Sequence, residues 1–193
     1  MLGIQERKIV GAYSLWLKDI PFLFTHAGLR PAMMQRLIDH APPHADIAHG
    51  MLFFDSIINN KLITSIQKCT TDIANSLQPC LLNDEIFQAG PERHGRSIGG
   101  SYWTDFQVLK ESAQNDPLGT NPFIQIVGHS IGMGKIRHTS TMNAVCVDVG
   151  IYLGGRAYLE IGGDGHLTAI ESMKQNKTKQ WQRTDLSKQY CMK

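Results

Sequence analysis

The stretch Ile20-Pro21-Phe22-Leu23-Phe24-Thr25-His26-Ala27-Gly28-Leu29-Arg30-Pro31 places a histidine between an apolar run and a proline. A short apolar run is typical of a buried strand, and proline is favoured at the first position of a helix. In mixed α/β sheets, functional side chains gather where strands end, because the loops there meet at one crevice. The stretch therefore predicts a strand, a loop and a helix, with His26 at the end of the strand.

A second histidine follows a second apolar run. Phe123-Ile124-Gln125-Ile126-Val127 predicts a buried strand, and Gly128-His129-Ser130 comes directly after it. Neutral imidazole is the commonest metal ligand and is suited to proton transfer near neutral pH. We therefore expect His26 and His129 to meet over one metal ion.

The rest of the chain predicts an α/β or α+β domain with mixed β-sheets flanked by helices. Further helices are expected at 31–40, at about 46–78 and up to about Gln114, and further strands at 144–149, 156–161 and 167–170. Gly162-Gly163-Asp164-Gly165 suits a hairpin turn between the last two strands. Residues 4–18 show a loosely helical pattern, and Pro21 indicates an early or edge position for the first strand. We expect the domain to cover 1–171 and a polar, mobile tail to cover 172–193.

Composition and charge exclude several classes of function. The 193 residues are 42% apolar and 19% charged, which is ordinary for one globular domain with a sizeable core. A formal net charge of +2 is too small to indicate nucleic acid as a partner. No apolar run approaches the ~20 residues of a membrane span, and the first residues lack the apolar stretch of a secretory signal. The four cysteines show no disulfide-dense pattern, so we expect a reduced, cytoplasmic protein.

Gly128-His129-Ser130-Ile131-Gly132 also matches the G-x-S-x-G turn that presents the nucleophile of α/β-hydrolases. In that turn a helix must follow the serine, whereas glycines and β-branched residues follow here and are poor helix formers. The downstream acid and histidine would be Asp148 or Asp164 with His166, and few residues remain to separate them. A serine hydrolase with Ser130 as its nucleophile is an alternative that this context disfavours.

Four segments resemble the calcineurin-like metallophosphoesterases, in particular the bacterial-type serine/threonine protein phosphatases. Residues 22–31 resemble their VHAGLRP segment, and Val127-Gly128-His129-Ser130 resembles their VGHT segment. Tyr102-Trp103-Thr104-Asp105 resembles their WSD or WTD element, and residues 144–156 resemble their ICIDTGxxYGGR strand and turn. The four segments occur in the order found in the family and cover about residues 15–170.

The resemblance implies two packed mixed sheets flanked by helices, with a pair of divalent metal ions (Mn, Fe or Zn) at the strand ends. Such ions activate water and hold the phosphoryl oxygens of a phosphate ester during hydrolysis. By resemblance, His26 and His129 would bind the same ion of the pair. Asp105 would lie near the site, and Arg93 or Arg96 would hold the substrate phosphate, although a solvated basic loop explains those arginines equally well. The substrate would be a phosphoprotein or another phosphoester.

The resemblance covers only the C-terminal half of the family domain, and so only a partial calcineurin-like sandwich. In the family, a metal-binding Asp-x-His, a bridging Asp and an Asn-His with the general-acid histidine all precede the HAG element. The 25 residues before His26 contain no histidine or asparagine, and Asp19 is their only aspartate. We therefore expect a phosphoesterase chain that is inactive alone and holds at most one metal ion weakly. Its partner would be an N-terminal half or another protein.

A non-catalytic binding or regulatory protein on the same scaffold is the alternative class. Such a protein would fold and bind a partner without hydrolysing phosphate esters. Phosphatase activity after addition of the family's N-terminal half separates the two classes.

Overall fold

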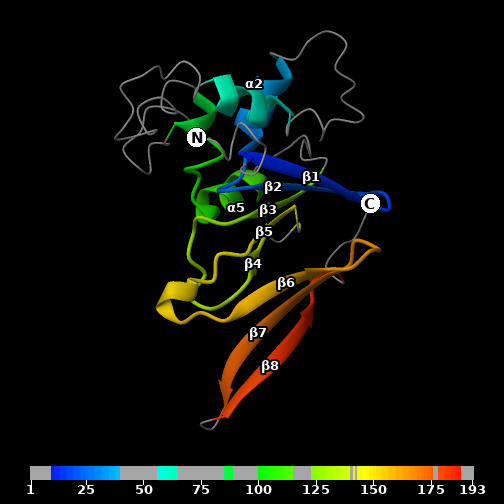
Figure 1. Cartoon of the computed structure of the whole chain (residues 1–193), viewed down its shortest axis with the longest axis vertical. Coiled ribbons are helices and arrows are strands. Elements are labelled where there is room, and N and C mark those ends of the chain that lie inside the picture. Colours follow the sequence, from blue (N-terminus) through cyan, green and yellow to red (C-terminus); the bar gives the residue numbers. More distant parts are fainter. Residues whose placement is uncertain are drawn as a thin grey trace.

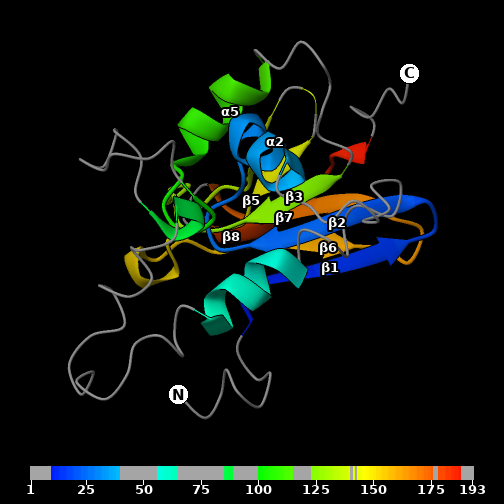
Figure 2. The same ribbon diagram turned by 90° about the horizontal axis from the view of Figure 1, so that it is seen from above.

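The computed structural model describes residues 10–39, 56–64, 85–88, 100–114, 123–139, 141, 143–175 and 178–187. A five-stranded mixed sheet packs against a three-stranded antiparallel sheet, and helices cover the other face of the larger sheet (Figure 1, Figure 2). This is an α/β-type fold with mixed strands and flanking helices, as the sequence predicts.

The larger sheet has the strand order β1-β2-β3-β5-β4. Its strands are β1 (Ala12–Leu17), β2 (Ile20–Thr25), β3 (Ile124–Val127), β4 (Arg137–His138) and β5 (Ala144–Cys146). β2, β3 and β5 run parallel, while β1 and β4 are antiparallel to their neighbours. The three parallel strands therefore end at the same edge of the sheet.

The helices lie on one face of this sheet. α2 (Pro31–Asp39) and α5 (Phe106–Gln114) confirm the helices predicted after Arg30 and before Gln114. Of the helix expected at 46–78, residues 56–64 are helical and the others lie outside the described residues. The described part of the chain also contains two short 3-10 helices, η2 (Glu85–Phe87) and η4 (Ile151–Leu153). Among the described residues, no helix has the length and apolar character needed to cross a membrane.

Residues 12–17 form β1 and not part of the helical segment expected at 4–18; residues 4–9 lie outside the described residues. β1 pairs with β2 across a two-residue turn in which Lys18 has a φ of 52°, as tight hairpin turns favour. The cross-strand pairing overrides the weak helical pattern. Pro21 lies early in β2 as expected, but β2 has a neighbour on each side, so the edge position is wrong. The ladder between β2 and β3 begins at Phe22, and the missing N–H of Pro21 therefore interrupts none of its bonds.

The smaller sheet is an antiparallel meander of β6 (Ala157–Ile161), β7 (Leu167–Gln175) and β8 (Thr178–Asp185). The predicted hairpin turn at 162–165 is confirmed between β6 and β7. Residues 172–175 and 178–185 belong to strands and not to the tail expected from residue 172, while residues 188–193 lie outside the described residues. The β7–β8 hairpin extends away from the body of the molecule (Figure 1).

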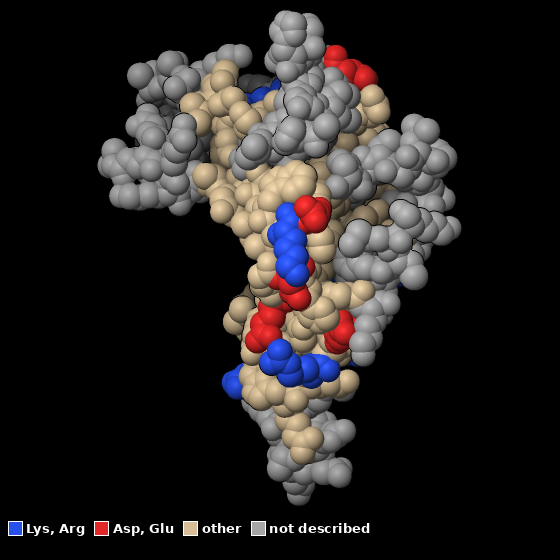
Figure 3. Space-filling model, turned by 90° about the vertical axis from the view of Figure 1, so that its right-hand side faces the viewer, with Lys and Arg blue, Asp and Glu red and all other residues tan. Residues whose placement is uncertain are grey.

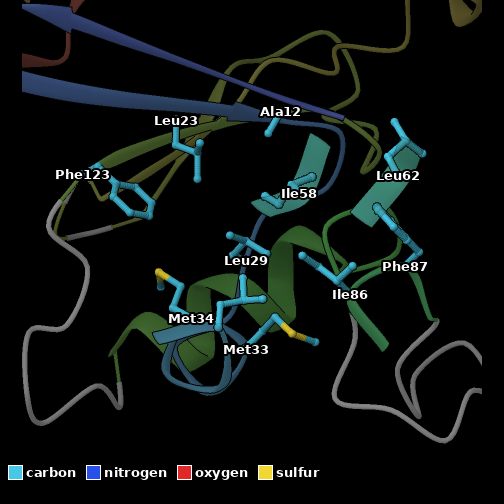
Figure 4. Packing of buried hydrophobic residues seen from close by; sticks show 11 residues of the cluster. Ala12, Leu23, Leu29, Met33, Met34, Ile58, Leu62, Ile86, Phe87 and Phe123 are labelled. Carbon is cyan, nitrogen blue, oxygen red and sulfur yellow. The ribbon is translucent and has the colours of Figure 1, made fainter. Parts of the chain in front are cut away.

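Successive side chains of the central strands point to opposite faces of the larger sheet, and this divides the core into two parts. Phe22 of β2 faces the smaller sheet, whereas Leu23 faces the helices. Between the sheets lie buried Phe22, Ile124, Ile126, Ile136, Val145, Val149, Leu167, Ala169 and Leu186. Under the helices, Leu29, Met33 and Met34 pack with Leu23, Ile58 and Phe87 (Figure 4). Each fully buried large apolar side chain contributes about 1.5–3 kcal/mol, so this packing holds the sheet, the helices and the second sheet together.

Charged side chains of alternating sign form a column on one side of the molecule (Figure 3). On the smaller sheet, Arg183 Nη2 donates to Glu160 Oε2 at 2.6 Å, and His166 Nε2 lies 3.1 Å from Asp185 Oδ1. The pKa of Asp164 is lowered, first by a hydrogen bond from the backbone N–H of His166 and then by charges that include Lys18 of the β1–β2 turn.

Gly155 lies where the backbone folds closely over Val149. A Cβ at Gly155 would overlap the carbonyl oxygen of Val149, whereas a Cβ at Gly163 would meet nothing within 4 Å. We expect Gly155→Ala to lower the free energy of unfolding by about 1–3 kcal/mol, because the backbone must move to admit the methyl group. Urea denaturation measures the change, and Gly163→Ala is the matched control, expected within about 0.5 kcal/mol of the wild type. Equal midpoints for the two variants would contradict this packing.

Candidate functional site

The ends of β2 and β3 bring His26 and His129 together. Thr25 pairs with Val127 in the parallel register, and the backbone N–H of Gly128 donates to His26 O at 2.8 Å. Nε2 of His26 lies 3.1 Å from Nδ1 of His129, with the ring centroids 5.0 Å apart. Two histidines 103 positions apart in the chain therefore occupy one site. Their binding of a metal ion stays a prediction.

Gln125 of β3 holds the loop that follows His26. The Gln125 side chain is 1% exposed; its Oε1 accepts from Leu29 N at 2.6 Å and its Nε2 donates to Leu29 O at 2.9 Å. Gly28 has a φ of 98°, and a Cβ there would lie 2.8 Å from a methyl group of Leu109. Only glycine fits this turn without strain, so the glycine of the H-A-G sequence is a structural requirement of the loop.

Aromatic rings surround the two imidazoles. Tyr102 stacks at a tilt on His26 with centroids 5.7 Å apart, and Trp103 meets His129 edge-on at 5.8 Å. The backbone N–H of Ala27 donates to Ser101 O at 2.7 Å and so holds this aromatic segment against the histidine loop. Burial raises the pKa of the Tyr102 phenol. The rings keep part of the site away from water.

Burial also lowers the pKa of His26, and the negative charge of Asp148 opposes part of that shift. Asp148 comes two residues after β5, the third parallel strand, and therefore lies at the same edge of the sheet as the two histidines. Sequence reasoning considered Asp148 only as the acid of a serine hydrolase. The strand expected at 144–149 would include Asp148, but β5 ends at Cys146, so this boundary error hid the position of Asp148 after the strand.

Asp105 reaches this site through Ser130. Oγ of Ser130 donates to Asp105 Oδ1 at 3.3 Å and accepts from the backbone N–H of Phe106 at 2.8 Å. After Gly132 the chain forms a turn and then β4, where a nucleophile elbow would need a helix. The Ser130 hydroxyl therefore faces the beginning of α5. Arg93 and Arg96, the predicted phosphate contacts, lie outside the described residues.

The described site offers few donor atoms for a metal ion. Two nitrogen ligands on a tetrahedral zinc ion are about 3.3 Å apart, since each Zn–N bond is about 2.0–2.1 Å. The observed 3.1 Å is close to that spacing, and it also suits an N–H···N hydrogen bond between metal-free rings. Within the described ranges, no group of three or more His, Cys, Asp and Glu side chains could hold a metal ion. The described residues thus bring together two candidate ligands, His26 and His129, which are fewer than a pair of ions needs.

We expect His26 to titrate with a pKa below the ordinary value of 6.5. Since the unfolded chain binds this proton more tightly, His26 costs the fold nothing well above pH 6.5. The loss of stability builds up as the pH falls from 6.5 to the lowered pKa and is complete below that pKa. An NMR titration of the imidazole carbon-bound protons measures the value. Asp148→Asn should lower the pKa of His26 further, because it removes the opposing charge and keeps the Oδ1 that accepts from Gly150 N. A pKa at or above 6.5 in the wild type would contradict the expectation.

A scan against protein-family models found no match for this chain, and neither did searches of curated proteins and of solved structures.

Proposed function

We propose that this chain is part of a metal-dependent phosphoesterase of the serine/threonine protein phosphatase type, with a calcineurin-like sandwich of which it forms the C-terminal part. His26 and His129 would bind one divalent ion (Mn, Fe or Zn). The observation that carries the proposal is the 3.1 Å approach of their ring nitrogens at the ends of two adjacent parallel strands. A mixed sheet packed against a second, antiparallel sheet, with helices on its other face, supports the α/β class of fold that this proposal requires.

A bound ion of this kind supplies a Lewis acid and an activated water for attack on a phosphate ester. The residues of this chain hold and orient its ligands. Gln125 fixes the loop after His26, and the lowered pKa of His26 keeps its ring neutral, and therefore able to bind metal, at neutral pH. Tyr102 and Trp103 pack against the two imidazole rings and limit their movement. The substrate would be a phosphoprotein or another phosphoester, with Arg96 and Asp105 as the proposed residues near its phosphate.

The experiment measures hydrolysis of p-nitrophenyl phosphate in the presence of Mn²⁺. The chain alone should be inactive. Addition of a phosphatase fragment that carries the Asp-x-His, the bridging Asp and the Asn-His should produce hydrolysis that EDTA abolishes. The His129→Ala chain with the same fragment is the control and should stay inactive.

Two outcomes would overturn the proposal in favour of another class. A fragment that binds the chain tightly without any hydrolysis would favour the non-catalytic scaffold. Labelling of Ser130 by a fluorophosphonate probe, above the level of a Ser130→Ala control, would favour the serine hydrolase.

A further inference from the structure

We infer that Ser130 is a positioning residue: it ties the beginning of α5 to the strained turn at His129 and so keeps the His129 ring facing His26. The role as a tie follows from the contacts of Ser130 alone. Its consequence for metal binding rests on the proposed function of the two histidines.

The side chain of Ser130 caps a helix from a distant part of the chain. Phe106 is the first residue of α5, and its backbone N–H donates to Ser130 Oγ at 2.8 Å, across 24 positions of sequence. The first N–H groups of a helix have no partner within the helix, and a serine oxygen is among their preferred acceptors. Oγ of Ser130 also donates to Asp105 Oδ1 at 3.3 Å. One hydroxyl therefore joins the loop after β3 to the beginning of α5 by two hydrogen bonds.

The backbone carbonyl of Ser130 is held as well. Its oxygen accepts a hydrogen bond from Arg137 Nη2 of β4 and another from Cys146 Sγ of β5 at 3.2 Å. The Arg137 guanidinium lies 5.0 Å from the centroid of the Phe106 ring, so it contacts both partners of the cap. Contacts from α5, β4 and β5 thus fix the position of Ser130.

His129 needs this support because its backbone is strained. Its φ is 65°, and the N–H of Ser130 donates to Gly128 O at 2.7 Å across it. A three-residue turn with positive φ at its centre is rare and strained, and a strained residue persists only where its surroundings hold it. Ser130 is the next residue along, so its cap and its carbonyl contacts hold the turn. Without them, His129 can relax toward negative φ and its ring moves away from His26.

The test compares Ser130→Ala with Ser112→Ala, a serine near the other end of α5 whose Oγ donates to Leu109 O at 3.0 Å. Two quantities are measured: Zn²⁺ affinity by calorimetry, and the nuclear Overhauser effect between the His26 and His129 ring protons in metal-free protein. Loss of a group that orients a ligand typically weakens metal binding 10–100-fold. We expect Ser130→Ala to weaken Zn²⁺ binding at least tenfold and to lose the inter-ring effect. Ser112→Ala should change neither, and Ser130→Thr, which keeps a hydroxyl, should restore both.

Ser130→Ala protein that keeps wild-type Zn²⁺ affinity and the inter-ring effect would overturn the inference. If Ser130→Ala does not fold, Arg137→Met is the second test, because it removes the hydrogen bond to the Ser130 carbonyl. This variant should weaken Zn²⁺ binding several-fold, and unchanged binding would again overturn the inference. The two readouts separate the two proposals. Wild-type protein without Zn²⁺ binding would refute the metal site, while the inter-ring effect would still test whether Ser130 positions His129.

Discussion

His26→Ala and His129→Ala should each abolish specific Zn²⁺ binding by the folded chain, whereas the wild type should bind about one equivalent weakly. Each variant leaves a single imidazole, and one neutral nitrogen ligand does not retain a metal ion against water. The nitrogen atoms of the two rings lie 3.1 Å apart, so both can reach one ion with little movement. Isothermal titration calorimetry measures the loss, expected to be at least about 100-fold in affinity.

The chain has eight histidines, so the control must exclude unspecific binding. His166 serves this purpose, because it lies on the smaller sheet and contacts Asp185. His166→Ala should bind Zn²⁺ like the wild type. At a Zn²⁺ concentration 100 times the dissociation constant, the wild type should gain about 2.7 kcal/mol in unfolding free energy, and the two site variants should gain none. Equal binding by the wild type and both variants would mean that the two histidines do not share a metal site.

Gln125→Leu should lower the free energy of unfolding by about 2–6 kcal/mol. The Gln125 side chain is buried and pairs with both the N–H and the carbonyl of Leu29. Leucine has a similar size but leaves both backbone groups without these partners, at about 1–3 kcal/mol each. Urea denaturation followed by circular dichroism measures the change. Because Leu29 lies three residues after His26, Zn²⁺ affinity should fall as well.

Gln107→Leu is the matched control for this substitution. Gln107 lies exposed on α5 and donates from Nε2 to Glu111 Oε1 at 2.7 Å. Its replacement removes a hydrogen bond that water can replace, so we expect a change within about 0.5 kcal/mol. A Gln125→Leu midpoint no lower than that of Gln107→Leu would show that the contacts of Gln125 with Leu29 do not stabilise the fold.

Apolar runs and the positions of proline and glycine predicted those helices, strands and turns that depend on only a few neighbouring residues. The apolar runs before His26 and Gly128 are β2 and β3, Pro31 begins α2, and the glycine-rich turn at 162–165 joins β6 and β7. In each case the burial of one segment and the backbone preference of one residue are enough to specify the local structure. The same reasoning was wrong for β1, whose strand depends on pairing with β2.

The sequence by itself determined which segments are buried and that each histidine follows a strand. Only the tertiary structure decided that β2 and β3 are neighbours in parallel, which brings His26 to His129, and that Asp148 lies at the same edge. It also decided that Ser130 caps α5. The physical reason is that strand pairing and a distant helix cap join residues far apart in the chain. Local periodicity does not predict which strand will pair with a given strand edge, or which group will hydrogen-bond to a given hydroxyl.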